Sequence, residues 1–329
     1  MFFRNALAVV TGVSMLAACG QMPRLDVRLG AGDQPKHFTA FAVGDEPQAV
    51  RMAERILAAH GTAADAATAL GLELAVALPS VAGLGGGGTC LVHQADEQGV
   101  RALHMPRLGP GLRVLQSTYG RLAWSQLVTP AENLARFGQP VSPTLAAHLR
   151  ESGALMNDAT ALASFMNSRR QMLQAGETLT QPQLAEALAL LRAGKGDVRD
   201  IPQWRNVDHT DQTFSLASAS ENRTTAATSF IVGDDKGHVV ACVLTMGRLF
   251  GTGRLQEGVL QGDAEAIQAT VFDVQITLAS GRVRSAQATG AFQNTMDCTT
   301  ENALGTVACK AAVDPRGAGL AVMLSEDRE

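Results

Sequence analysis

Residues 78–93 read LPSVAGLGGGGTCLVH, which places four consecutive glycines between a helical pattern and a predicted strand. Before them, Ala63–Leu78 carries apolar residues at intervals of three and four, the spacing of a helix. After them, Thr89–His93 predicts a short strand. A glycine costs about 0.5–1 kcal/mol relative to alanine in a regular element, so the run indicates a backbone that passes close to another segment or to a ligand. The four glycines of this loop are Gly85, Gly86, Gly87 and Gly88.

The same run formally satisfies the glycine pattern of dinucleotide-binding proteins. In those proteins the glycines follow a strand and open a helix, so that the helix N-terminus faces the pyrophosphate. Here they follow the helix Ala63–Leu78 and precede the strand Thr89–His93, which is the reverse order. We therefore predict no nucleotide cofactor, and we expect no other cofactor.

The rest of the chain divides into a helical front half and a strand-paired back half. Apolar periodicity predicts four further helices, at Gln48–His60, Ser125–Phe137, Thr144–Leu155 and Gln183–Ala193. Two hairpins follow, one from 229–232 to 239–246 and one from 271–278 to 282–286. Trp204–Thr213 is expected to be an irregular crossing between the halves. This order of elements predicts an α+β fold in which helices cover a largely antiparallel sheet system.

Composition bounds the class of protein. The chain has 329 residues, with 27 Lys and Arg against 31 Asp and Glu, and 46% of its residues are hydrophobic. A chain of this length can bury a large core without metal or disulfide staples. Its cations form no block, which excludes a nucleic-acid surface, since phosphate binding needs clustered positive charge. We expect one globular domain over residues 38–329.

The first residues predict export. Residues 1–18 combine a basic start at Arg4 with an apolar stretch that is too short to span a membrane, as in a secretory signal peptide. The sequence LAAC at residues 16–19 resembles the lipobox of bacterial lipoproteins, in which Cys19 would carry the lipid. Residues 19–37 would then form a tether. We expect a membrane-anchored lipoprotein that faces the periplasm, with the outer membrane favoured; a soluble export signal with an incidental cysteine is the alternative.

Four further cysteines follow. Cys298 and Cys309 lie close together in the sequence and are expected to form a disulfide in an oxidising compartment. Cys90 and Cys242 each lie in an apolar run and are interpreted as small buried hydrophobic residues. The spacing of the cysteines and histidines matches no zinc site, so we predict no metal.

Several blocks of the sequence together resemble the gamma-glutamyltranspeptidase family. The most specific block joins GTAADAA at residues 61–67 to the glycine-containing stretch that begins at Leu78. The others agree in order along most of the chain: residues 119–124, 129–131, 141–143, 176–185 and 237–253. The resemblance implies the αββα sandwich of the N-terminal nucleophile hydrolases, here truncated. Residues 38–222 would correspond to the helical large subunit and residues 223–329 to the strand-rich small subunit.

The resemblance implies a self-cleaving precursor. In this family the precursor is cut just before a threonine, and that threonine becomes the nucleophile. A hydroxyl needs a base to attack, and the newly freed α-amine supplies it. The substrate is a γ-glutamyl amide of the glutathione type, whose acyl group passes to water or to an amine. Backbone N–H groups of a glycine pair stabilise the oxyanion. A small γ-glutamyl molecule is therefore the expected partner.

This sequence departs from the family at the nucleophile. Counted back from Gly237 without gaps, the family's Thr-Thr-His-aromatic start falls on residues 227–230, so the nucleophile position holds Ala227. Thr228 follows directly, but side chains on a strand alternate between faces, so its hydroxyl would point away from the site. Thr228 becomes a candidate nucleophile only if the preceding loop shifts by one residue.

Further positions are assigned by the same resemblance. Arg107 matches the arginine whose planar guanidinium would bind a substrate carboxylate, although a surface arginine without a specific role is the alternative. Thr245 falls among the substrate-binding residues. Gly247 replaces an asparagine side chain that would contact substrate, and Gly290 keeps one of the two oxyanion glycines.

The chain is also shorter than the family's usual precursor, chiefly between residues 197 and 222 and again after Arg107. Two functions remain open. One is a γ-glutamyl hydrolase or transferase that uses Thr228; the other is a catalytically inactive, lipid-anchored member with a binding or structural role. A decaying copy that folds poorly is a third possibility.

Overall fold

The computed structural model describes residues 39–195, 202–207, 209–210, 212–216, 226–270, 272–300 and 307–324. Lys36–Glu329 forms one compact unit. The expected signal peptide, Cys19 and the tether lie outside the described residues, as does most of the segment just before Ala227. In the described ranges, every helix is too short or too polar to cross a membrane.

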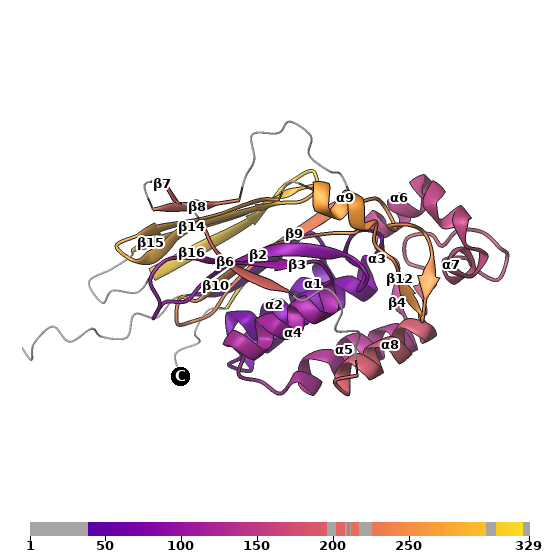
Figure 1. Ribbon diagram of the computed structural model, residues 1–329, viewed down its shortest axis with the longest axis horizontal. Helices are drawn as coiled ribbons and strands as arrows, with labels where there is room; N and C mark the ends of the chain where they lie inside the picture. Colours follow the sequence, from indigo (N-terminus) through magenta and orange to yellow (C-terminus); the bar gives the residue numbers. More distant parts are fainter. Residues whose placement is uncertain are drawn as a thin grey trace, which may run out of the picture. The chain divides into compact units, whose positions relative to one another are not determined.

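Two antiparallel sheets stack on one another in the described chain (Figure 1). The first has the order β17-β1-β9-β10-β2-β3-β6. Its strands are β1 (Ala40–Gly44), β2 (Gly87–His93), β3 (Arg101–Met105), β6 (Gln203–Asn206), β9 (Ala227–Gly233), β10 (Val239–Thr245) and β17 (Leu320–Leu324). The second has the order β16-β15-β14-β13-β8-β7. Its strands are β7 (His209–Thr210), β8 (Thr213–Ser215), β13 (Asp273–Ala279), β14 (Arg282–Thr289), β15 (Gln293–Thr300) and β16 (Val307–Val313).

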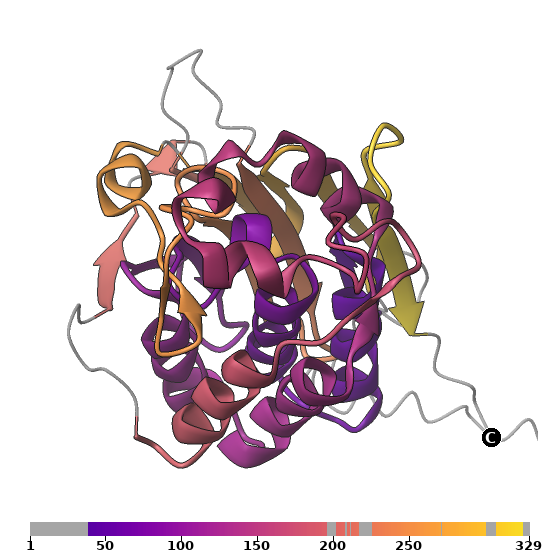
Figure 2. The ribbon, with the colours of Figure 1, turned by 90° about the vertical axis from the view of Figure 1, so that its right-hand side faces the viewer.

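The helical layer packs on the face of the first sheet that is turned away from the second sheet, as Figure 1 shows, and Figure 2 views the molecule from its right-hand end in Figure 1. They are α1 (Pro47–Ala58), α2 (Ala63–Ala77), α3 (Pro79–Ala82), α4 (Leu108–Tyr119), α5 (Trp124–Phe137), α6 (Pro143–Glu151), α7 (Ala159–Ser164) and α8 (Pro182–Arg192), with a 3-10 turn at Gly153–Asn157. A last short helix, α9 (Ala264–Ala269), precedes β13. Two small ribbons complete the fold: β4 (Gln139–Pro140) with β5 (Thr178–Leu179), and β11 (Leu255–Gln256) with β12 (Val259–Leu260).

Helix α2 is the centre of the helical layer. All of its residues are buried, which its many alanines allow because small side chains let neighbours approach from every side. A capping box starts the helix: the Asp65 N–H donates to the Thr62 hydroxyl, and the Thr62 N–H donates to the Asp65 carboxylate. The same carboxylate also accepts the Arg121 and Leu122 N–H groups, which ties the start of α5 to α2.

A second hydrophobic core fills the space between the sheets. It joins residues such as Val43 and Ile231 of the first sheet to Val274, Ile276 and Ala288 of the second. Strand β13 alternates buried and partly exposed residues, as expected for a strand covered on one face only. The described layers are therefore helices, sheet and sheet, which confirms the predicted α+β class.

The helices and hairpins predicted from periodicity are present with bounds shifted by a few residues. The irregular crossing expected at Trp204–Thr213 is wrong, because β6, β7 and β8 lie there. Strand β6 pairs with β3, and the Arg101 guanidinium lies 4.6 Å from the Trp204 ring centre. An edge strand held by such contacts has no apolar alternation by which the sequence could reveal it.

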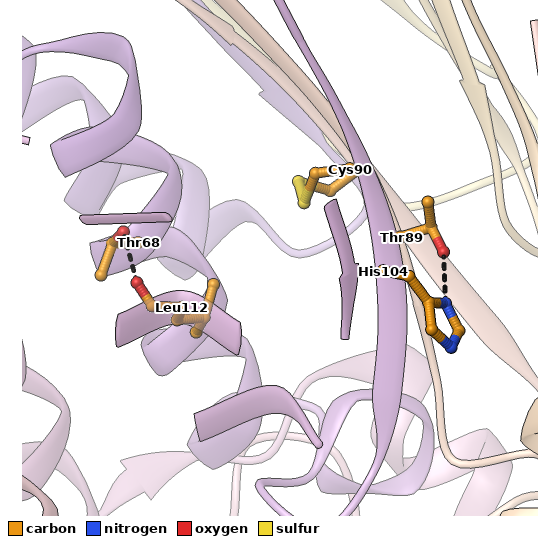
Figure 3. Close-up of a disulfide and its surroundings, with 6 residues drawn as sticks. Thr68, Thr89, Cys90, His104 and Leu112 are labelled. Atoms are coloured by element: carbon orange, nitrogen blue, oxygen red, sulfur yellow. Dashed lines mark hydrogen bonds between the residues drawn. A yellow bond between two sulfur atoms is a disulfide. The ribbon is translucent and has the colours of Figure 1, made fainter. Parts of the chain in front are cut away.

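Both cysteine pairs are linked. Cys298 and Cys309, the pair expected from the sequence, lie opposite each other on β15 and β16 and form a disulfide. Cys90 and Cys242 are buried, as interpreted, but they are also linked: β2 and β10 pair them in register, with a Cα–Cα distance of 4.1 Å, and they form a second disulfide that the sequence did not predict. Figure 3 shows Cys90 on the side of β2 that faces the helices, opposite to Thr89. Their 152-residue separation concealed this pairing from the sequence.

Candidate active site

The strand register gathers the positions that the sequence singled out at one end of the first sheet. Ala227, at the start of β9, pairs with Thr245 at the end of β10. Thr245 in turn pairs with Gly87 at the start of β2. The expected nucleophile position, a substrate-binding candidate and the glycine loop therefore lie on three adjacent strands.

The glycine loop is explained by other backbone segments. A Cβ atom at Gly86 would lie 2.6 Å from the Thr245 carbonyl oxygen, and one at Gly88 would lie 2.5 Å from that of Val243. At Gly87 it would lie 2.6 Å from the Met105 carbonyl oxygen, and at Gly85 it would clash with that of Leu260. The sequence left open whether the glycines make room for another segment or for a ligand. In the described chain, the close neighbours are backbone atoms of other segments.

At Gly290 the second sheet lies close to the start of β9. It follows β14, and a Cβ atom there would lie 2.7 Å from the Thr228 Cα. The next residue, Ala291, donates its N–H to the Ala227 carbonyl oxygen at 2.9 Å. The turn between β14 and β15 is thus hydrogen-bonded directly to the first residue of β9.

Arg107 lies at the start of α4, beside the glycine loop. The next residue, Leu108, donates its N–H to the Gly86 carbonyl oxygen at 2.8 Å. Arg107 lines a small cavity of about 160 Å³ together with Leu84, Lys195 and Glu257. Ala227 and Thr228 do not line this cavity, nor the cavities of about 380 and 940 Å³ enclosed by described residues.

Ala227 is only 2% exposed and belongs to the core between the sheets, with Ile231. Thr228 lies on the opposite face of β9 and is 1% exposed. Its hydroxyl donates to the Asp45 carboxylate, with an Oγ1–Oδ2 distance of 2.9 Å. The structure thus places Thr228 next to the expected nucleophile position, while its hydroxyl is directed elsewhere.

Asp45, just after β1, is the centre of a buried polar cluster that the sequence did not reveal. Its Oδ2 also accepts the Ser229 N–H at 3.0 Å, and its Oδ1 accepts the Asn294 amide at 2.8 Å. Burial raises the pKa of Asp45 to about 6, although the hydrogen bonds from Ser229, Asn294 and Thr228 oppose the shift. We call Asp45, Thr228, Ser229 and Asn294 the Asp45 cluster; it joins β1 and β9 to β15.

Two backbone donors correspond to the expected oxyanion site, and both are occupied. The Gly290 N–H donates to the Phe292 carbonyl oxygen at 3.0 Å, and the Ala291 N–H donates to that of Ala227. An oxyanion hole requires donors that are directed at the position of the developing negative charge. In this arrangement these two donors stabilise the turn instead.

Thr245 and Gly247 shape the turn that follows β10. The Thr245 hydroxyl donates to the Ala226 carbonyl oxygen at 2.7 Å and accepts the Gly247 N–H at 2.9 Å. Gly247 has a φ of +81°, and a Cβ atom there would lie 2.7 Å from the Asp263 carbonyl oxygen. Both residues are therefore explained by local backbone structure. Among the described residues, no three His, Cys, Asp or Glu side chains are grouped to hold a metal.

Comparisons with known proteins point to one family. Its model, "Gamma-glutamyltranspeptidase", matches residues 49–111 and 97–201. Human glutathione hydrolase 7 is 28% identical over 215 residues, which cover 57% of this chain and 32% of the relative. The glutathione hydrolase proenzyme of Pseudomonas aeruginosa is 29% identical over 189 residues, which cover 48% of this chain and 33% of the relative. The chain thus spans about a third of the length of these curated relatives.

This chain is similar in fold to a solved structure. The cephalosporin acylase from Bacillus halodurans superposes with a TM-score of 0.60 over 79% of this chain and 75% of its own. The two sequences are 13% identical. At that level of identity the likeness concerns the fold alone.

Proposed function

Because the chain belongs to the gamma-glutamyltranspeptidase family and has its N-terminal nucleophile hydrolase fold, we propose that it is a member that has kept the fold and lost the covalent chemistry. In this proposal it remains one uncleaved chain and acts as a binding protein for small molecules of the γ-glutamyl type. The observation that carries the proposal is Ala227, a buried methyl group at the position where the family resemblance requires a hydroxyl.

The surroundings of Ala227 support the same conclusion. Acyl transfer by this route needs a hydroxyl nucleophile, a nearby base and donors for the oxyanion. The nearest hydroxyl along β9, that of Thr228, donates to Asp45 on the other face of the strand. The expected oxyanion donors, at Gly290 and Ala291, are hydrogen-bonded within the protein. One substitution would therefore not be enough to restore the chemistry.

The test is electrophoresis of the purified chain together with an assay using a chromogenic γ-glutamyl anilide. We expect a single band on a denaturing gel and no release of the amine. In Ala227→Thr, which restores the hydroxyl, we expect weak self-cleavage at most. Two fragments split at residue 227 or 228 in the unsubstituted protein would refute the proposal.

A second candidate function rests on the contact between Thr228 and Asp45. The hydroxyl lies 2.9 Å from a carboxylate whose pKa burial raises to about 6, an arrangement that could activate a nucleophile. A hydrolase of this kind would release the anilide, and Thr228→Val would abolish the release while Ala227→Ser would not. Activity that persists in Thr228→Val would eliminate Thr228 as the nucleophile.

We also propose that the protein is exported and anchored through a lipid on Cys19. The support is the lipobox-like sequence at residues 16–19. Growth with a labelled fatty acid should label the chain and leave Cys19→Ala unlabelled and released from membranes. An unlabelled native chain would favour the soluble export signal instead.

A further inference from the structure

A large cavity lies away from Ala227, between the start of α1, the second half of α5 and residues 138–143. We call it the α1–α5 cavity. Its volume is about 940 Å³, which is in the range of small-molecule sites. No catalytic role assigned by the family resemblance falls on its lining, so its side chains require a separate explanation.

Glu73 is the most unusual of these side chains. It is the one glutamate on helix α2, whose other residues are mostly alanine and leucine, and it is 4% exposed. Its Oε2 is buried, and no described residue donates a hydrogen bond to it. A buried carboxylate oxygen without a donor is costly, and each such atom in a folded protein calls for an explanation, of which a bound donor is one. Because Glu73 lines the cavity, a ligand could supply it.

Glu46 adds a second carboxylate to the lining. It is 5% exposed, and its Oε2 is also buried without a donor from the described residues. Ser142 and the Gln48 N–H hydrogen-bond the carboxylate, so Glu46 is partly satisfied. Burial raises the pKa of both glutamates, that of Glu73 to about 7. Both groups would therefore gain from a cationic partner inside the cavity.

Arg51 and Arg55 supply the opposite charge at the rim. They lie four residues apart on α1, which places them on one helix face, and both are exposed. Neither forms an ion pair within the described part of the chain. Arg55 is near enough to Glu73 to lower its pKa slightly, but burial outweighs this effect. The lining also includes the apolar side chains of Met52, Leu134 and Phe137, the last of which is 75% exposed.

We propose that the α1–α5 cavity binds a zwitterion with an apolar body, which is an apolar α-amino acid or the amino end of a short apolar peptide. The ammonium group would donate to Glu73, the carboxylate or a peptide carbonyl would face Arg51 and Arg55, and the side chain would lie along Leu134 and Phe137. A divalent cation is a poorer match, because such ions take six or more oxygen ligands and the lining carries two carboxylates. This proposal does not depend on whether the chain is catalytic.

The test is calorimetric titration of the purified full chain with four probes. Phenylalanine carries all three groups, phenethylamine lacks the carboxylate, 3-phenylpropionate lacks the ammonium, and the dipeptide Phe-Gly represents a peptide amino end. We expect phenylalanine or Phe-Gly to bind, and each truncated analogue to bind at least about tenfold more weakly, the value of one charged hydrogen bond. The tighter of the first two probes identifies the source.

Variants then locate the site. Glu73→Gln, which keeps the shape of the side chain, should weaken binding about tenfold or more. Glu186→Gln on α8, an exposed glutamate outside the cavity, should leave it unchanged. Arg51→Gln, on the surface, should weaken the binding of phenylalanine and leave that of phenethylamine unchanged, which tests the site even if Glu73→Gln folds poorly. Unchanged binding in Glu73→Gln, equal binding of phenethylamine and phenylalanine, or no binding of any probe would overturn the proposal.

Discussion

The Asp45 carboxylate shows how one residue joins the two sheets beside Ala227. It accepts hydrogen bonds from a hydroxyl, a backbone N–H and an amide that come from two sheets. Hydrogen bonds to a charged group contribute about 1.5–3 kcal/mol each, so the cluster stabilises the junction of β1, β9 and β15. A Thr228 hydroxyl that is used structurally in this way is not available as a nucleophile without loss of that stability.

Glu73 makes stability depend on pH. Its folded pKa, about 7, lies above its ordinary value of 4.5, so the folded state binds more protons between these pH values. The free energy of unfolding should therefore fall as pH rises from about 4.5 to 7. Glu73→Gln removes this dependence, so we expect its stability relative to the native chain to rise by about 3 kcal/mol between pH 4 and pH 8.

Denaturant titration at the two pH values measures this difference. Asp45, whose pKa is also raised, is present in both proteins, so its contribution cancels in the comparison. Glu186→Gln is the matched control and should follow the native chain at both pH values. A constant difference between Glu73→Gln and the native chain would show that Glu73 is not protonated on folding.

Gly290 gives a second prediction at this scale. A methyl group there would lie 2.7 Å from the Thr228 Cα, a contact that neither backbone can avoid without moving. We expect Gly290→Ala to destabilise the protein by about 1–3 kcal/mol, the usual range for overpacking. Gly153→Ala is the control, because nothing lies within 4 Å of the added atom. Thermal unfolding of the two variants compares them, and equal melting temperatures would contradict the close approach of the two sheets.

At the scale of elements, the strand pair β2 and β10 is fixed by its glycines and by a disulfide. Cys90 and Cys242 close a loop of 152 residues, whereas Cys298 and Cys309 close one of 11. A crosslink restricts the unfolded chain more when the loop is longer. We expect Cys90→Ala with Cys242→Ala to lower the free energy of unfolding by about 5 kcal/mol, and Cys298→Ala with Cys309→Ala to lower it by about 3 kcal/mol.

Chemical denaturation under oxidising conditions compares the two double variants. A reducing agent should destabilise the native chain and leave unchanged a variant in which these four of the five cysteines are replaced. If the Cys298–Cys309 variant proved the less stable, the loop-length argument would not hold for this fold.

Local sequence patterns predicted most helices and hairpins. Features that depend on contacts between distant parts of the chain could not be predicted from such patterns. Helix α2 and the hairpin of β9 and β10 follow from periodicity and turn residues within a short window. Strand β1 was missed because a single short apolar run has no such period. Asp45 and Asn294 could not be found together, because 249 residues separate them and only the strand order brings them into contact. The family resemblance made it possible to predict that Ala227 lies close to Thr245 and Gly87.

At the scale of the whole molecule, the division into a helical segment (38–222) and a strand-rich segment (223–329) describes the sequence and not the packing. The first sheet takes β1, β2, β3 and β6 from the first segment and β9, β10 and β17 from the second. Strands β9 and β10 lie between β1 and β2. Each segment alone would leave several strand edges and the apolar core unpaired.

We therefore expect neither segment to fold by itself. Expressed alone, residues 38–222 and residues 223–329 should aggregate or lack a cooperative thermal transition, because the missing strands leave buried backbone groups without partners. Co-expressed, they should assemble into one soluble complex with a single transition, since the join at residues 222–223 interrupts no described strand. Circular dichroism melts and size-exclusion chromatography measure both outcomes. A cooperative transition in either isolated segment would show that the sheet does not need the interleaved strand order that places Ala227 between Asp45 and the glycine loop.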